Sequence, residues 1–110
     1  MKFHTTLSEF NRRIADRVRD LFSHDVTPQQ GDDGRLYFRG PSPSTGAQVV
    51  AYLESDLQSA LDKMSPEARE ENEGYLIENL VTQIRTQYDP NKPRREALEA
   101  KGTVAMLQRE

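Results

Sequence analysis

Few side chains in this sequence have the type and spacing that catalysis or metal binding requires. Cysteine is absent, which excludes disulfides, cysteine-bound zinc and thiol catalysis. The two histidines, His4 and His24, lie in neither a His-x3-His nor a Glu-x-x-His pattern. The Gly-x-Ser-x-Gly motif and the dinucleotide fingerprint are also missing. We expect no catalytic residue, metal or cofactor, although Asp and Glu side chains from distant positions could still converge on an enzymatic site.

Two glycine-containing loops could in principle hold a ligand, but their spacing favours plain turns. Residues 40–46 precede an expected helix, whose first amides could bind a phosphate, yet they lack the lysine and the spacing of a Walker motif. Residues 31–34, with Asp25 nearby, lack the alternating ligands and the closing glutamate of a calcium loop. We expect a helix-capping loop at 40–46 and a hairpin turn at 31–34.

An acidic run occupies the middle of the chain. Residues 54–78 contain eight acidic and two basic residues. Carboxylates in the first turn of a helix stabilise its dipole, which is a structural role. As a surface, the same charge would steer association with a basic groove on a partner protein. The acidic candidates for partner contact are Glu67, Glu70, Glu71 and Glu73.

Three of the four tyrosines lie off the apolar stripes of the expected elements. Tyr37 alternates with apolar neighbours, and Tyr52 and Tyr75 fall outside the stripes of their expected helices, whereas Tyr88 is expected in the core. Tyrosine is enriched among the residues that dominate binding energy at interfaces. Tyr37, Tyr52 and Tyr75 are therefore candidates for partner contact, unless a second layer of this chain covers them.

Two basic clusters support an alternative function, the binding of nucleic acid. The arginines of the first expected helix alternate with Asp16 and Asp20 at helix-neighbour spacing, which cancels much of their charge. To form a phosphate-binding surface, these arginines would have to converge, in the fold or across a dimer, with the second basic cluster at residues 92–95. The alternative nucleic-acid contacts are Arg12, Arg13, Arg17, Arg19, Lys92, Arg94 and Arg95.

Hydrophobic periodicity predicts that helices position most of these residues. Apolar residues at steps of three and four predict helices over 6–24, 46–64 and 66–88. Thr6 is expected to cap the first of them through a capping box. Gly74 could break the third, because glycine is unfavourable inside a helix.

Turn residues predict the remaining elements. The dipeptide Asp33-Gly34 indicates a hairpin over 26–40 with a type I′ turn. A short helix is expected over 92–101, and residues 102–110 form a tail of undetermined structure. The predicted fold is a predominantly helical α+β domain: three to four amphipathic helices, with one β-hairpin between the first and the second helix.

Length and composition limit the size of the core. A chain of 110 residues suits a single domain spanning 1–110. Hydrophobic residues make up only 35% of it, so self-association through the helix 66–88 or through Val104–Leu107 would bury further apolar area. We expect a homodimer as readily as a monomer. The longest apolar run, Val49–Leu53, is far below the roughly 20 residues of a membrane span, and no secretory signal is present, so the expected compartment is the cytoplasm.

These observations favour a binding function. The leading hypothesis is a small non-enzymatic protein–protein interaction module, an adaptor or an inhibitor of a larger machine, of the kind that phages and mobile elements encode. It would use an acidic helical surface and exposed tyrosines. A formal net charge of −3 gives the chain no overall attraction to nucleic acid or to anionic lipid, so nucleic-acid binding is the alternative.

Overall fold

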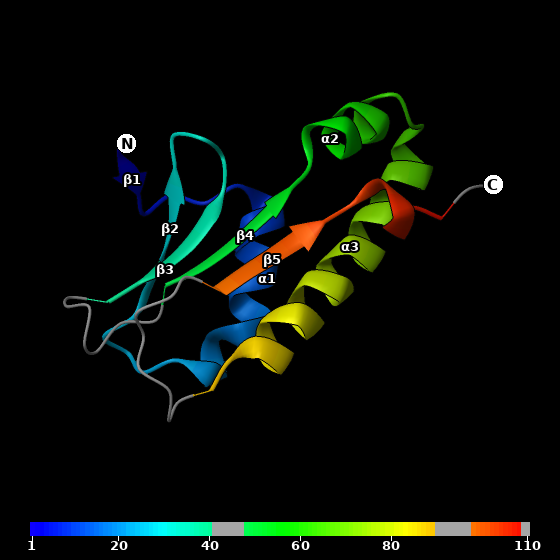
Figure 1. The fold of residues 1–110 in the computed structure, drawn as a ribbon. Helices are drawn as coiled ribbons and strands as arrows, with labels where there is room; N and C mark the ends of the chain where they lie inside the picture. The colour runs from blue at the N-terminus through cyan, green and yellow to red at the C-terminus, as the bar shows by residue number, and fades with distance from the viewer. Residues whose placement is uncertain (41–47, 90–97, 109–110) are drawn as a thin grey trace.

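The fold is built on a five-stranded mixed sheet with helices on one face. The structure is a computed structural model that describes residues 1–40, 48–89 and 98–108. The strands lie in the order β1 (Phe3–His4), β2 (Thr27–Gly31), β3 (Leu36–Arg39), β4 (Val49–Leu53) and β5 (Leu98–Gly102). Figure 1 shows helix α1 (Glu9–Val18) behind the sheet and helix α3 (Pro66–Gln87) alongside β5. The predicted architecture of helices with a single hairpin is therefore wrong. Three further strands extend the hairpin into a sheet: β1 at the N-terminus, and β4 and β5, which the hydrophobic pattern did not separate from helices.

The antiparallel part of the sheet contains the predicted hairpin. Strand β1 (Phe3–His4) pairs with β2 (Thr27–Gly31), which pairs with β3 (Leu36–Arg39). The turn differs from the type I′ prediction, because among the described residues only Gly34 has a positive φ, of +80°. The Gly34 amide donates to Gly31 O at 2.9 Å, as in a type I turn followed by a left-handed glycine.

Strand β4 (Val49–Leu53) and helix α2 (Ser55–Asp62) replace the single helix predicted over 46–64. Val49 and Ala51 face the core and are buried, while Val50 and Tyr52 face the other side of the sheet. The segment therefore alternates with a period of two before it becomes helical. The β-branched pair at 49 and 50 favours the strand.

Helix α3 (Pro66–Gln87) lies within the range predicted for the third helix. Ser65 caps it by accepting a hydrogen bond from Ala68 N at 3.3 Å, and Pro66 occupies the first turn, where its missing amide costs nothing. Gly74 lies inside the helix without a break.

Strand β5 (Leu98–Gly102) pairs in parallel with β4 and corrects the helix predicted over 92–101. Tertiary pairing overrides the helix propensity of Leu, Glu, Ala and Lys in this segment. Positions 92–97 of that predicted helix, and 41–46 of the predicted loop, lie outside the described residues. In the predicted tail, a short 3₁₀ turn forms at Val104–Met106.

Helix α1 (Glu9–Val18) continues as a 3₁₀ turn at Arg19–Leu21 and is shorter than the predicted helix 6–24. Ser8, not Thr6, caps it by accepting from Asn11 N at 3.2 Å. The start of the helix is fixed at this residue because the Ser8 amide also donates to Gln30 Oε1 of β2 at 2.7 Å.

Two hydrophobic clusters hold these elements together. The larger cluster packs the inner faces of α1 and α3 against β3, β4 and β5, with Ile14, Phe38 and Leu80 among its buried residues. The smaller cluster joins α2 to α3 and to residues 104–107. Its members are Leu57, Leu61 and Leu76, with Phe10, Leu53, Met64, Val104, Met106 and Leu107 partly buried against them.

Helix length and polarity bear on membrane insertion. None of the helices within the described ranges combines the length and the apolar character that crossing a bilayer demands.

Candidate functional site

The face of the sheet opposite the helices carries aromatic and basic side chains from several strands. Because successive side chains of a strand alternate between faces, Tyr37 and Arg39 point away from the core that Leu36 and Phe38 enter. The pairing register places side chains from β1, β4 and β5 beside them. We call this surface the aromatic face, formed by Phe3, Arg35, Tyr37, Arg39, Tyr52 and Lys101.

Arginine side chains stack on two of the rings. The guanidinium carbon of Arg35 lies 4.1 Å from the centre of the Tyr52 ring, and that of Arg39 lies 4.0 Å from the centre of the Phe3 ring. Phe3 also meets Tyr37 edge-on, with ring centres 5.0 Å apart and planes at 85°. Such contacts contribute about 0.5–1 kcal/mol each at exposed sites. The rings and guanidinium groups therefore hold one another in a defined arrangement before any ligand binds.

Gly31 and Asp33 fix the position of the Tyr37 ring. A β-carbon at Gly31 would lie 2.8 Å from Tyr37 Cε2, so only glycine leaves room for the ring there. The Tyr37 hydroxyl donates to Asp33 Oδ2 at 2.6 Å. Burial, together with this hydrogen bond to a carboxylate, raises the pKa of Tyr37 to about 12.

The carboxylate of Asp33 is stabilised in its charged form by the same contact. Partial burial acts to raise its pKa, but hydrogen bonds from the Tyr37 hydroxyl and from the Arg35 amide outweigh that effect and hold the pKa below its ordinary value. The phenol of Tyr37 thus remains neutral while Asp33 remains ionised at neutral pH. This pairing keeps the ring in one orientation on the aromatic face.

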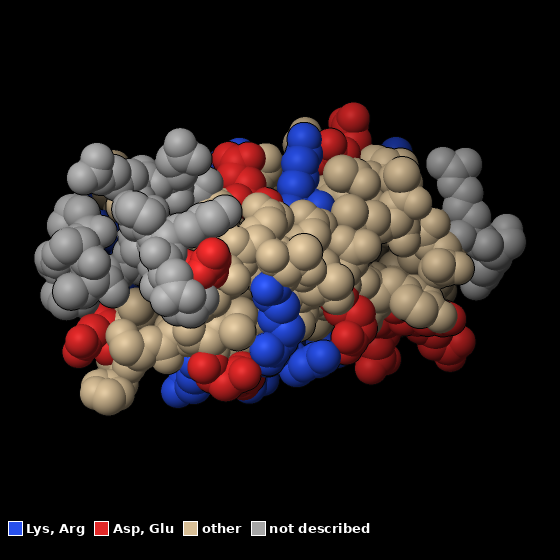
Figure 2. Space-filling model, turned by 60° about the horizontal axis from the view of Figure 1, so that its bottom comes forward, with Lys and Arg blue, Asp and Glu red and all other residues tan. Residues whose placement is uncertain are grey.

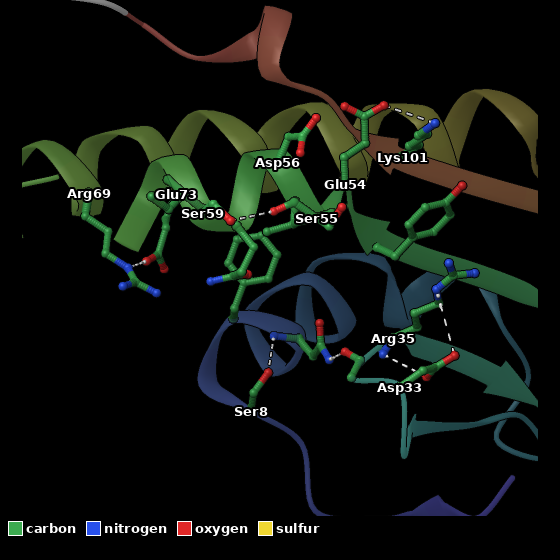
Figure 3. Close-up of a pocket in the computed structure, with 17 residues that line it drawn as sticks. Ser8, Asp33, Arg35, Glu54, Ser55, Asp56, Ser59, Arg69, Glu73 and Lys101 are labelled. Atoms are coloured by element: carbon green, nitrogen blue, oxygen red, sulfur yellow. Dashed lines mark hydrogen bonds and ion pairs between the residues drawn. The ribbon is translucent and has the colours of Figure 1, made fainter. Parts of the chain in front are cut away.

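A groove of about 1020 Å³ adjoins the aromatic face where β4 ends. Figure 3 shows its two walls, one formed by α2 and Glu54, the other by the start of α1 and the β2–β3 turn. Arg35, Tyr52 and Lys101 line the groove and also belong to the aromatic face. The two features therefore form one continuous surface.

Charged side chains in the groove pair with one another. Arg69 Nε lies 2.7 Å from Glu73 Oε1, and Lys101 Nζ lies 3.1 Å from Glu54 Oε1. The hydrogen bond to Glu54 raises the pKa of Lys101. Because these charges already neutralise each other, the groove offers polar contacts without a strong charge of either sign.

Within the parts of the chain that the structure describes, no group of three or more His, Cys, Asp or Glu side chains could hold a metal ion. His4 Nε2 lies 2.7 Å from Asp32 Oδ1 on the surface, and hydrogen bonds from His4 and from the Lys2 amide lower the pKa of Asp32. His24 lines a separate pocket of about 400 Å³ that also contacts Phe22.

The residues predicted for partner binding divide between two regions. Tyr37 and Tyr52 come together on the aromatic face, whereas Tyr75 lies on α3 and is 46% exposed. The acidic residues Glu67, Glu70 and Glu71 are exposed in the first half of α3. Glu73 is the one predicted glutamate that lines the groove, where it pairs with Arg69.

Of the four basic side chains predicted for nucleic-acid contact that the structure describes, three pair with carboxylates. Arg12 and Arg19 both approach Asp16, at 3.4 and 4.0 Å, and Arg17 pairs with Glu78 of α3. Arg13 is exposed on α1. Figure 2 shows basic and acidic side chains interspersed over the face that it presents. The second cluster, Lys92, Arg94 and Arg95, lies outside the described residues.

Sequence reasoning missed four members of the aromatic face: Phe3, Arg35, Arg39 and Lys101. The alternation around Tyr37 already indicated that Arg35 and Arg39 share its side of the strand, and this signal could have identified them. Phe3 and Lys101 gave no comparable signal, because β1 has two residues and β5 lies in a segment with helical propensity.

Comparison of the chain with protein-family models, with curated proteins and with solved structures found no match.

Proposed function

We propose that this protein is a non-enzymatic protein-binding module, an adaptor or an inhibitor of a larger machine, and that its contact surface is the aromatic face. The observation that carries the proposal is a set of three aromatic rings on the sheet, two of them stacked with arginines and the third in edge-on contact with one of these two. Tyrosine and arginine dominate binding energy at protein interfaces, above all where the surrounding contacts exclude water.

Preorganisation strengthens this interpretation. Tyr37, Tyr52 and Arg39 extend from strands paired on both sides, and their side chains contact neighbouring rings or guanidinium groups. A partner would therefore pay little ordering entropy to use them. The adjoining groove gives room for a projecting segment of the partner, with paired charges along its walls.

A second candidate function, the binding of single-stranded nucleic acid, is favoured by the same rings. Bases stack on exposed aromatic side chains of a sheet, and arginine adds cation–π contacts. Its weakness is electrostatic, because Asp33 lies 3.8 Å from Arg35, and Glu54 pairs with Lys101. A nucleic-acid surface normally carries an excess of positive charge.

Affinity capture with matched variants tests the proposal. Tagged wild-type protein, the face variant Arg39→Ala/Tyr52→Ala and the control variant Arg13→Ala/Tyr75→Ala would be incubated with nuclease-treated lysate of the source cell or its host. Each variant removes one arginine and one tyrosine, but the control removes them from helices α1 and α3. We expect a protein partner that the face variant binds roughly 100-fold more weakly and the control binds normally.

Two outcomes would contradict the proposal. If the control loses the partner while the face variant retains it, the contact surface lies on the helices. If only nucleic acid is recovered without nuclease, with affinity falling steeply as salt increases, the second candidate function replaces the first.

A further inference from the structure

Among the described residues β5 is the last strand of the sheet, so its outer edge pairs with no further strand. Leu98 N donates to Gln48 O, and Glu54 N donates to Gly102 O, so residues 98 and 102 bond toward β4. In a parallel ladder alternate residues bond to the same neighbour. The backbone groups of Glu99 and Lys101 therefore point outward.

Two glutamines of α3 occupy this edge. The Lys101 amide donates to Gln83 Oε1 at 3.0 Å, and Gln83 Nε2 donates to Lys101 O at 2.9 Å. Gln87 Nε2 donates to Glu99 O at 3.1 Å. The Gln83 amide thus reproduces the pair of hydrogen bonds that a residue of a neighbouring antiparallel strand would make. We call Gln83 and Gln87 the glutamine clasp.

The edge that the clasp covers is complementary to itself. If two copies of β5 paired antiparallel around Ala100, Glu99 of each copy would lie opposite Lys101 of the other. Opposite charges across an antiparallel pair stabilise it. In this register Glu99 of one copy and Lys101 of the other form a hydrogen-bonded pair, in which each residue bonds to the other through its backbone N–H and C=O. The backbone groups of both residues point outward from the sheet, as such pairs require.

We propose that the β5 edge is a self-association site, which pairs antiparallel with β5 of a second copy of this chain and is held closed in the monomer by the glutamine clasp. An uncovered edge strand is a template for pairing with another chain. Pairing would exchange the clasp's hydrogen bonds for backbone hydrogen bonds between the copies. The clasp therefore competes with the second copy and sets the dimer affinity.

Removing the clasp tests the competition. Sedimentation equilibrium over a wide concentration range would compare the wild type, the variant Gln83→Ala/Gln87→Ala and the control Gln58→Ala, whose glutamine lies on α2 and bonds with Asp62. We expect the clasp-free variant to dimerise at least about tenfold more tightly than the wild type and the control. A clasp-free variant that is folded and no more associated than the wild type would overturn the proposal.

Charge exchange tests the register. In the clasp-free background, Glu99→Lys would place lysines opposite lysines, and Lys101→Glu would place glutamates opposite glutamates. Each change should weaken self-association by about tenfold. An equimolar mixture of the two variants should recover a dimer, because every glutamate then faces a lysine.

The mixture is the deciding measurement, since Lys101 also pairs with Glu54 within its own chain. Only Lys101→Glu removes that internal pair with Glu54. If this loss were the cause of weaker association, mixing the two variants would not restore the dimer. Circular dichroism would verify that both variants are folded. Failure of the mixture to dimerise, or unchanged dimerisation of both single-charge variants, would rule out the antiparallel β5 pairing.

Discussion

Asn72 on α3 accepts a hydrogen bond from the backbone amide of Gln108 at 2.8 Å, although the two residues are 36 positions apart in the sequence. The same side chain donates to Ala68 O at 2.9 Å and contacts Met64 Sδ at 3.5 Å. Asn72 is buried, so these contacts satisfy a polar group that water cannot reach. One asparagine therefore holds the segment after β5 against the smaller hydrophobic cluster.

Replacing Asn72 should loosen that segment. Asn72→Ala removes the hydrogen bond that ties the Gln108 amide to α3, and we expect a loss of about 0.5–1.5 kcal/mol in the free energy of unfolding. Urea denaturation would measure the loss, and hydrogen exchange should show faster exchange around residues 104–108. The control Glu70→Ala changes an exposed residue of the same helix, and equal losses in the two variants would contradict the role of Asn72.

Two glycines should respond to substitution in opposite directions. A β-carbon at Gly102 would overlap Leu53 Cδ2 and lie 3.2 Å from Leu57 Cδ2, whereas a β-carbon at Gly74 would meet no described atom within 4 Å beyond its own stretch of helix. We expect Gly102→Val to destabilise the fold by about 1–3 kcal/mol through overpacking. Gly74→Ala, inside α3, should stabilise it by about 0.5–1 kcal/mol. Thermal and urea unfolding would measure both, and a stabilising Gly102→Val would refute the close packing of β5 on α2.

Acid should weaken the contact between α1 and α3. The hydrogen bond from Arg85 lowers the pKa of Asp20, and the hydrogen bond from Arg17 lowers the pKa of Glu78, from ordinary values of 3.8 and 4.5. A carboxylate whose folded pKa is lowered stabilises the fold above its unfolded pKa, and this stabilisation is lost as the pH falls through the folded pKa.

Unfolding free energies measured from neutral to acidic pH would test this expectation. Stability should decrease below about pH 4, and the variants Asp20→Asn and Glu78→Gln should each flatten the decrease. Because both carboxylates are exposed, raising the salt concentration should reduce the effect. Identical pH profiles for the wild type and both variants would show that these pairs do not couple protonation to folding.

Tyr37 and Asp33 should be coupled in their titration. Tyr37→Phe removes the hydroxyl that donates to Asp33, so the pKa of Asp33 should rise toward its ordinary value of 3.8. Carboxyl chemical shifts measured by NMR during acid titration would report this change. The control Tyr75→Phe, on α3, should leave the Asp33 titration unchanged. An Asp33 pKa that stays the same in Tyr37→Phe would mean that Arg35 and the Asp33 backbone hold the pKa down without the Tyr37 hydroxyl.

The sequence identified elements that have a long or distinctive local signal. Ser65-Pro66 and the apolar periodicity after it indicated the third helix, and Asp33-Gly34 indicated a hairpin. The segment after Val49 was ambiguous because five residues of strand lead directly into a helix, and a short apolar run satisfies both periods. Tyr52 was predicted to lie outside the core because it fell off the apolar stripe of an expected helix. The residue belongs to strand β4 instead, and the alternation of side chains along that strand places it on the aromatic face.

The missing part of the site depended on contacts between distant segments. Lys101 belongs to a strand with few apolar residues, and only its pairing with β4 makes that segment extended. Phe3 joins the aromatic face through a strand of two residues. Neither residue could be assigned to a surface before the order of the strands was known, because propensity is a local property and strand order is not.

The parallel pairing of β4 with β5 has a consequence for the order of folding. Strands β2 and β3 are joined by a tight turn and can pair early, whereas β4 and β5 are separated in the chain by α2 and α3, so their pairing closes a long segment. Closing so long a segment delays the pairing. Until β5 arrives, β4 is itself the border of the growing sheet, with Val49 and Val50 unprotected. That interval is when two folding chains are most prone to join at the wrong strand.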